Sequence, residues 1–420
     1  MSGYDRLRAF KNYILAYLVI ATTGIHFFSQ RYVKLGLLVI LTYFFILRIK
    51  KIKRFKNSVI FWGIVFSVLI IIQQYKYAIV DPIMYLNTLA PRVILPWLLY
   101  HFLDDKLPKY YVKVMVILAI ISFLFWLPDN LVPGFHSQIS KLPYILNSDP
   151  NLNRQFLLYT VEDPDFRVDF IKFRNPGQFI EPGVFGLFLT VALIFQIIFD
   201  EGKITWKSLL FIVTMLTTFS TATYLGLVVI FIYLLLRNKK IHFVFRVSMV
   251  LISFIIFFQF FMNTEFLYEK LRYQYSLAIQ KSLYQPTQGR FYGTRKALNA
   301  IKEAPIFGRG LSKLSEVTDF SSPIYVRYTF LSTTVELGLI VFFYLLYHLL
   351  RYFRLILVEF NFDVRFSYFT WMALLLNLYS QNFMISTLFL CFVFYSFDKR
   401  FVNGPQKESV ENVVVSAQYS

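Results

Sequence analysis

A carboxylate at a predicted helix start is the first feature that could do chemistry. Glu181 directly precedes Pro182 and follows Arg174 in a segment rich in turn residues. Proline suits the first turn of a helix, where its missing N–H costs nothing, and it holds the preceding residue extended. The sequence therefore predicts Glu181 at a helix N-terminus, where the helix dipole favours its charge. Such a carboxylate could position or deprotonate a hydroxyl group, or it could only cap the helix.

Arginines between residues 289 and 310 form the second feature. Arg290 and Arg295 lie five residues apart and would not share one narrow helical stripe, and Arg309 stands between Gly308 and Gly310 on a predicted flexible turn. The planar guanidinium fork of arginine holds phosphate oxygens in pairs. On the sequence alone these residues are either solvated loop arginines near lipid headgroups or a phosphate-binding group.

Charges within or beside apolar segments are the third feature. Arg327 and Tyr328 open one apolar segment, Glu336 lies about two turns inside it, and Arg92 lies in another. A charge inside a membrane segment is costly and usually faces a cavity. The alternatives are that Arg92 extends to the membrane interface and that Glu336 is a paired structural carboxylate.

Several other chemistries have no support in the sequence. It contains no phosphate-binding P-loop and no dinucleotide fingerprint, its five histidines are scattered, and its single cysteine is Cys391. We therefore predict no metal site and no cofactor. Lys and Arg number 43 against 24 Asp and Glu, but they lie between apolar segments and form no separate basic domain, which argues against nucleic-acid binding.

The elements that must position these residues are membrane helices. The chain has 57% hydrophobic and only 16% charged residues, and its mean hydropathy is +0.55. A soluble domain carries about 25% charged residues. We predict an all-α integral membrane protein with about a dozen spans. They are residues 13–29, 34–47, 58–73, 83–103, 111–127, 183–199, 208–219, 222–236, 243–262, 329–349, 366–379 and 383–397.

Basic clusters predict the orientation of these spans. They follow the second, eighth, tenth and last spans, and with a cytoplasmic N-terminus, read as an uncleaved signal anchor, all of them face the cytoplasm. Residues 1–402 then form one transmembrane domain, and residues 403–420 form a polar cytoplasmic tail. Two long loops, about 128–181 and 263–328, lie outside. Residues 208–236 read as two short spans around a polar turn, with one long helix as the alternative.

One segment of the second loop reads as an amphipathic helix. Residues 290–302 place Ala297, Leu298 and Ile301 on one face, and Pro305 and Gly308 end the helix. No internal repeat is evident, which argues against a transporter built from repeats.

Short motifs in this order resemble the O-antigen polymerase and O-antigen ligase superfamily of bacterial envelopes, over about residues 90 to 380. One motif enters a mid-chain span, one is a Ser/Thr-rich turn, one lies in the second loop and one follows that loop. The motif residues are Arg174, Gly177, Phe179, Glu181, Pro182 and Gly186; residues 220–227; Arg290, Ala297, Leu298, Ile301, Pro305, Phe307, Gly308 and Gly310; and Glu336 with Gly338. Ligases of this superfamily usually carry a histidine before the last motif. This chain has Arg327 and Tyr328 there, and residues 263–328 contain no histidine, which favours a polymerase.

The resemblance implies a metal-independent glycosyltransferase with an all-helical, GT-C-like fold in the bacterial cytoplasmic (inner) membrane, both termini cytoplasmic. Its donor would be an oligosaccharide on polyprenyl diphosphate, and its acceptor a sugar hydroxyl of another lipid-linked repeat unit. Membrane lipids, a chain-length regulator and a flippase are the further partners it implies. The alternatives are a ligase that transfers finished glycan and a non-enzymatic transporter or flippase of lipid-linked sugars.

The resemblance also suggests roles for the residues singled out above. Arg290 is expected to bind the donor diphosphate, and Glu181 to position or deprotonate the acceptor. The remaining candidates for substrate binding are Arg174, Arg92, Arg295, Arg309, Arg327, Tyr328 and Glu336.

Overall fold

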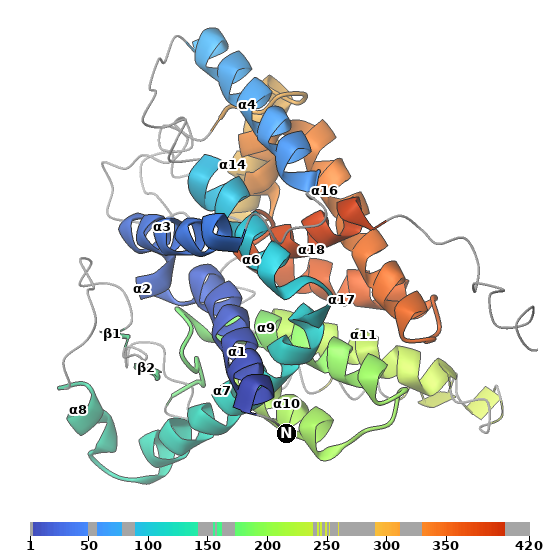
Figure 1. The fold of residues 1–420 in the computed structure, drawn as a ribbon. Coiled ribbons are helices and arrows are strands. Elements are labelled where there is room, and N and C mark those ends of the chain that lie inside the picture. The colour runs from blue at the N-terminus through green and yellow to red at the C-terminus, as the bar shows by residue number, and fades with distance from the viewer. Residues whose placement is uncertain are drawn as a thin grey trace, which may run out of the picture.

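The fold is a bundle of helices of unequal length (Figure 1). The computed structural model describes residues 3–48, 57–77, 89–141, 154–155, 158–161, 173–237, 290–310 and 330–399, and also residues 242, 244–245, 248–249, 252 and 259. The helices of the first half are α1 (Gly3–Gly24), α2 (His26–Ser29), α3 (Arg31–Arg48), α4 (Ser58–Tyr77), η2 (Ala90–Ile94), α6 (Leu95–Leu103), η3 (Asp104–Lys106), α7 (Leu107–Leu131) and α8 (Phe135–Ile139). Those of the second half are α9 (Pro182–Phe199), α10 (Trp206–Thr217), α11 (Thr221–Arg237), α14 (Arg290–Glu303), α16 (Leu331–Glu359), α17 (Phe366–Ser380) and α18 (Thr387–Asp398).

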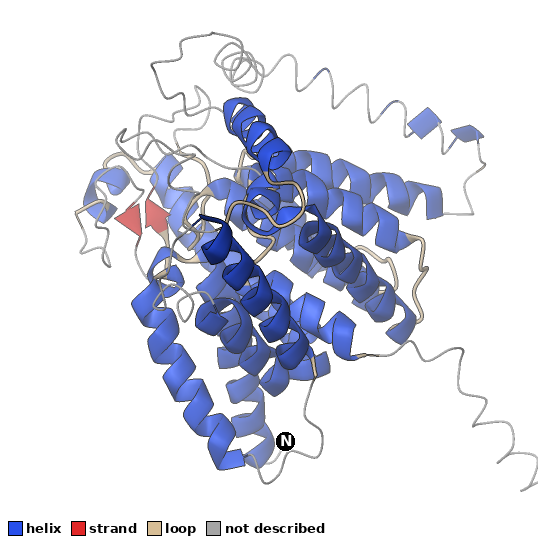
Figure 2. Cartoon of the chain, turned by 90° about the horizontal axis from the view of Figure 1, so that it is seen from above, coloured by secondary structure: helices blue, strands red, loops and turns tan. Residues whose placement is uncertain are grey.

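The described strands are two residues long. Strand β1 (Arg154–Gln155) pairs antiparallel with β2 (Thr160–Val161), with Arg154 opposite Val161. Figure 2 shows this pair at one side of an otherwise helical molecule. The expectation of an all-α protein is therefore confirmed, with a minimal hairpin added.

Every predicted span except 243–262, which lies almost entirely outside the described residues, coincides at least in part with a helix. Within the described ranges, four helical stretches are long and apolar enough to cross a membrane: Ser58–Lys76, Ala90–Leu131, Pro182–Phe199 and Leu331–Glu359. The helices Trp206–Thr217, Thr221–Arg237 and Thr387–Asp398 are apolar but shorter. The architecture is that of an all-α membrane protein, and the number of crossings stays a prediction.

The region that allowed two interpretations, residues 208–236, forms two helices. Helix α10 ends at Thr217 and α11 begins at Thr221, with a turn at 218–220 in which Phe219 has a positive φ of 46°. The Thr218 hydroxyl donates to the carbonyl of Met215, as short hydroxyl side chains do where a helix gives way to a turn. The single long helix is therefore wrong.

Helix α9 lies at the centre of the bundle. The apolar stretch of α9 is 94% buried inside the protein, compared with 33% for that of α4, so α9 is enclosed by protein on all sides. Helices α7, α10, α11 and α17 pack around it. Close approach to α11 depends on Gly186, where any side chain would overlap Thr223. A helix held this rigidly provides a fixed support for the loop that leads into it.

Arg237, Arg351 and Lys399 belong to the basic clusters after the eighth, tenth and last predicted spans, and they lie at one end of the bundle. Arg351 of α16 donates to the carbonyl of Lys399 after α18, and Arg237 at the end of α11 lies 4.2 Å from the ring centre of Phe362 after α16. These contacts agree with a shared face for the three residues. Which side of a membrane that face meets stays a prediction.

Two local expectations need correction. Leu298 was expected to share the apolar face of the helix over 290–302 with Ala297 and Ile301, but it is 48% exposed. The residues that pack against Val335 of α16 are Ala297 and Ala300. The reason is close packing of α14 on α16, which favours small side chains at the contact. Helix α7 also continues through Pro128 to Leu131, so the connection to α9 begins after residue 131.

Candidate functional site

The segment before α9 is fixed to two helices by one buried amide side chain. Asn175 Nδ2 donates to the hydroxyls of Ser122 on α7, at 3.1 Å, and of Thr217 on α10, at 3.0 Å. Its backbone N–H donates to the carbonyl of Thr217, and its Oδ1 accepts the N–H of Gly177. Gly177 has a φ of +56°, which glycine adopts most readily, and the chain turns there toward α9. The loop is thus held against the bundle by buried hydrogen bonds.

Glu181 ends this loop as the sequence predicts. It is extended, with φ −153° and ψ 158°, and Pro182 is the first residue of α9. Its side chain makes no hydrogen bond to the first turn, so it does not cap the helix with its carboxylate. Instead the side-chain amide of Gln381, after α17, donates to Glu181 Oε1. Gly183 permits this contact, because a Cβ there would lie 2.6 Å from Gln381 Nε2.

The second part of the site is a break inside helix α16. Gly338 has φ 80° and ψ 167°, a conformation that is essentially restricted to glycine, and it divides α16 into two helical segments. The break frees backbone groups that the turn after α14 then satisfies. Arg309 N donates to the carbonyl of Val335 at 2.7 Å, and Leu339 N donates to the carbonyl of Pro305 at 2.8 Å. The two family-like motifs, Pro305–Gly310 and Glu336–Gly338, therefore interlock through their backbones, and the turn expected to be flexible is pinned.

Gln73 of α4 joins the same two motifs. Its Nε2 donates to the carbonyls of Phe307, at 2.8 Å, and of Glu336, at 2.7 Å, and the side chain is buried. A Cβ at Gly310 would lie 2.9 Å from Gln73 Oε1, so the glycine leaves room for the amide. Three elements far apart in sequence thus meet at the break in α16.

An ion pair lies at this break. Arg92 Nη1 donates to Glu336 Oε2 at 3.0 Å, with the Glu336 side chain 4% exposed and the Arg92 side chain 27% exposed. Arg92 belongs to η2, a π-helical turn, and such turns are frequent at functional sites. Of the two interpretations offered for Glu336, the paired carboxylate is confirmed. The partly exposed guanidinium remains able to meet a second anion.

The two parts are connected by α16 and the turn after α17. Asn382, next to Gln381, accepts a hydrogen bond from the Thr333 hydroxyl at 3.2 Å, and Thr333 precedes Glu336 by three residues on the same helical face. Helix α14 also reaches this turn, since Thr294 Oγ1 lies 3.1 Å from the hydroxyl of Tyr379. Glu181, the Arg92–Glu336 pair and α14 therefore lie around one end of α16 and α17.

The other candidate arginines differ in their exposure and in their partners. Arg174 is half-buried beside Asn175, Arg295 is exposed on α14, and the Arg309 guanidinium pairs with the carboxylate of Glu303. Arg290 is the first residue of α14, and its backbone lies on the same helical face as Thr294, four residues later. The Arg290 side chain, Arg327 and Tyr328 lie outside what the structure describes.

Sequence reasoning missed the amide side chains that hold the site. Gln73, Asn175, Gln381 and Asn382 carry no motif, and their partners are distant in sequence. The available signal was the presence of amides beside or within apolar segments, where a polar group needs a partner.

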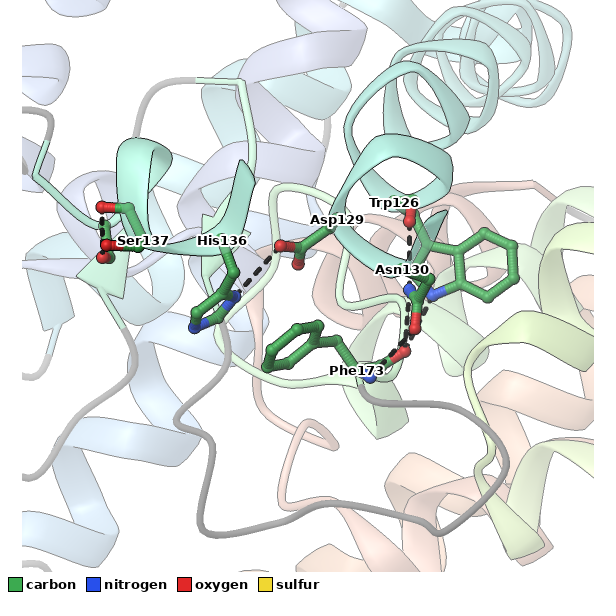
Figure 3. A network of polar contacts seen from close by, with 7 residues as sticks. Trp126, Asp129, Asn130, His136, Ser137 and Phe173 are labelled. Carbon is green, nitrogen blue, oxygen red and sulfur yellow. Dashed lines mark hydrogen bonds and ion pairs between the residues drawn. The ribbon is translucent and has the colours of Figure 1, made fainter. Parts of the chain in front are cut away.

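A further polar network, at the end of α7, was also missed (Figure 3). It joins Asp129, His136 and Phe173. Its sequence signal was weak, because Asp129 and His136 stand seven residues apart on either side of the turn that contains Gly134.

The arrangement suits reactions of anionic and hydroxyl groups. Glu181 offers a carboxylate at a helix start, and partly exposed Arg92, with Arg174 and Arg295, offers positive charge. Within the described ranges, no three His, Cys, Asp or Glu side chains are grouped as metal ligands. Guanidinium groups such as that of Arg92 can hold the negative charge of a substrate phosphate.

Comparison with known proteins agrees with the sequence motifs. Residues 207–346, about a third of the chain, match the family model described as O-antigen ligase. The matched region includes α14, the turn at 305–310 and the broken helix α16, whereas Glu181 and Arg92 precede it. No curated protein and no solved structure matches the chain. Residues 207–346 therefore match an O-antigen ligase-type domain of the O-antigen ligase and polymerase superfamily, in agreement with the resemblance carried by the sequence motifs.

Proposed function

We propose that the chain is a polysaccharide repeat-unit polymerase. It transfers a glycan from polyprenyl diphosphate to a sugar hydroxyl of another lipid-linked repeat unit at the outer face of the cytoplasmic membrane. The observation that carries the proposal is the meeting of Glu181, the Arg92–Glu336 pair and α14 around the ends of α16 and α17. The family match supports glycan transfer in general.

The chemistry needs an anion site and a proton acceptor. When the bond between the donor sugar and the diphosphate breaks, the leaving diphosphate carries negative charge, which arginines stabilise. Arg290 is the proposed diphosphate ligand, assisted by Arg174 or Arg327, and Arg92 contributes to the same anionic site. The acceptor hydroxyl attacks the sugar carbon and gives its proton to the Glu181 carboxylate.

The placement of Glu181 fits this role. Its carboxylate is not used in capping α9, and the Gln381 amide holds one of its oxygens, which fixes the direction of the side chain. Backbone on both sides is rigid, because Asn175 fixes the loop and α9 is enclosed. A base positioned in this way loses little freedom when the acceptor binds.

The ligase is the second candidate, since the matching family model is described as O-antigen ligase. The absence of a histidine from residues 263–328 favours the polymerase. A flippase would move lipid-linked units without making new bonds.

Purified protein in liposomes with lipid-linked repeat units distinguishes the three functions. A polymerase lengthens the glycan, and Arg290→Ala leaves single repeats. A ligase instead moves finished glycan to a different lipid acceptor, and a flippase gives translocation alone. Arg365→Ala removes an exposed arginine from the turn between α16 and α17 and is the matched control. Full-length polymer from stably expressed Arg290→Ala protein would exclude the role of Arg290, and a normal rate from Glu181→Gln would exclude Glu181 as the base.

A further inference from the structure

A buried carboxylate holds an imidazole at the end of α7. Asp129 Oδ1 and His136 Nδ1 are 3.0 Å apart, and the side chains are 1% and 21% exposed. Gly134, with φ +81°, allows the chain to reverse between α7 and α8, which brings His136 back against the last turn of α7. Figure 3 shows the imidazole beside Asp129 and Phe173, with its other nitrogen turned away from the carboxylate.

This pair is not needed to hold the neighbouring loop. The backbone of Phe173 is already fixed by three hydrogen bonds from α7: Trp126 Nε1 and Asn130 Nδ2 donate to its carbonyl, and Asn130 Oδ1 accepts its N–H. The Phe173 ring stacks on the imidazole, with centres 3.8 Å apart and planes within 2°. The stack fixes the plane of the ring, so Asp129 and Phe173 together set where Nε2 points.

Burying a carboxylate is costly, and Asp129 is incompletely compensated. Its Oδ2 is buried and has no hydrogen-bond partner within the part of the chain that the structure describes. Phe125 and Trp126, one turn before Asp129 on α7, and Phe135, next to His136, pack against an apolar cluster at this end of α7. A charge kept in such surroundings needs an explanation beyond packing.

We propose that Asp129 and His136 form a subsite that binds a sugar hydroxyl of the acceptor glycan; this rests on the proposed glycan transfer. With Nδ1 held against the carboxylate, His136 Nε2 faces away from it, where a neutral imidazole accepts a hydrogen bond and a protonated one donates. Nε2 has no protein partner within the described residues. A sugar hydroxyl both donates and accepts, so it can pair with Nε2 in either form, and the Asp129 carboxylate disfavours an anionic diphosphate at this place.

The position along the chain fits an acceptor subsite. Phe173 directly precedes Arg174, so the subsite and Glu181 lie at the two ends of the segment that Asn175 fixes. A repeat unit of several sugars can contact both places. In this arrangement Glu181 acts on the reacting hydroxyl, and His136 holds a hydroxyl of a more distant sugar.

The test uses a variant that removes the polar pair and keeps the packing. Asp129→Leu with His136→Phe replaces a buried pair with apolar groups of similar size and preserves the stack on Phe173, an exchange that is usually tolerated. In the liposome assay with lipid-linked repeat units, the KM for the acceptor should rise about tenfold, the effect of losing one strong hydrogen bond. The kcat and the dependence on donor concentration should not change.

A second measurement separates binding from structure. Acceptors that each lack one hydroxyl are compared with the complete acceptor. Wild-type protein should bind one of these deoxy acceptors more weakly than the complete acceptor, and the double variant should bind the two equally well. An unchanged acceptor KM overturns the inference, as does a loss confined to kcat. If the double variant does not fold, Asp129→Asn takes its place. Its amide oxygen still accepts from His136 Nδ1, so a smaller rise in the acceptor KM is expected, from the loss of the carboxylate charge alone. Absence of any new glycosidic bond with wild-type protein would instead overturn the proposed function.

Discussion

Replacing Gly338 by alanine tests whether the break in α16 is fixed by its contacts. A Cβ at Gly338 would overlap the carbonyl of Ile306 and lie 2.8 Å from Phe307 N. Both are backbone atoms, so no side chain can rotate to make room. The turn after α14 would have to separate from α16, or the backbone at residue 338 would have to change.

The magnitude follows from two terms. Holding a residue other than glycine at φ 80° and ψ 167° costs about 1–3 kcal/mol. Overpacking against a fixed neighbour costs about 1–3 kcal/mol more. If the turn separates instead, the hydrogen bonds from Arg309 N and Leu339 N are lost, at about 1 kcal/mol each. We therefore expect a loss of about 2–6 kcal/mol, a large share of the 5–15 kcal/mol that stabilises a typical domain.

The assay compares Gly338→Ala with a matched glycine elsewhere. Gly63 lies inside α4 with nothing within 4 Å of a Cβ placed there, so Gly63→Ala should be neutral or stabilising by up to about 1 kcal/mol. Thermal unfolding in detergent should occur at a clearly lower temperature for Gly338→Ala only. Glycan transfer, measured well below that temperature, should also fall, because the Arg92–Glu336 pair depends on the break. Equal unfolding temperatures and equal transfer for the two variants would refute the reasoning.

Three further outcomes are expected. Arg92→Gln leaves the buried carboxylate of Glu336 unpaired and should destabilise the protein by about 3–5 kcal/mol, whereas adding Glu336→Gln should recover part of that loss in the same unfolding assay. Gly186→Ala should lower the unfolding temperature through its overlap with Thr223, and Thr223→Ala in the same chain should restore most of it; no restoration would show that the contact is not the cause. Burial raises the pKa of Asp363, but hydrogen bonds from the backbone N–H and the guanidinium of Arg365 lower it by more. The pKa of Asp363 therefore lies below its ordinary value. Its contribution to stability is therefore present above the ordinary pKa and is lost as pH falls through the lower folded value, and Asp363→Asn should remove that acid-dependent part of the unfolding profile.

Local features of the chain predicted much of the fold. Hydrophobic segments located the described helices, although α1 begins ten residues before its predicted span and α16 ends ten residues after its own. The Ser/Thr-rich stretch around Thr218 predicted the break between α10 and α11. Proline at position 182 predicted the start of α9 and the extended conformation of Glu181. These predictions succeeded because each depends on the preferences of a few neighbouring residues. Leu298 was misplaced because the packing partner of α14, not the helix alone, decides which side chains are buried.

The pairing of site residues could not be predicted in the same way. Arg92 and Glu336 were both singled out, but nothing in the sequence shows that residues 244 positions apart form a pair. The Gln381 amide that holds Glu181 lies 200 positions away, and Gln73 lies 263 positions from Glu336. These contacts depend on how the helices pack, which a single sequence does not specify.

Irregular backbone is what allows a polar site in so apolar a protein. A continuous helix satisfies its own N–H and C=O groups and offers none to other segments, whereas a break in hydrocarbon surroundings leaves groups that must be paired within the protein. In α16 the freed carbonyls of Val335 and Glu336 are paired by Arg309 N and Gln73, so the second loop and α4 are drawn to the break. The glycines at 308, 310 and 338 make this approach possible, because a Cβ at any of them would collide with the facing segment or side chain. The same contacts that pair the backbone groups therefore bring Arg92, Glu336 and α14 close together. The glycines of the motif are as necessary to the site as its charged residues.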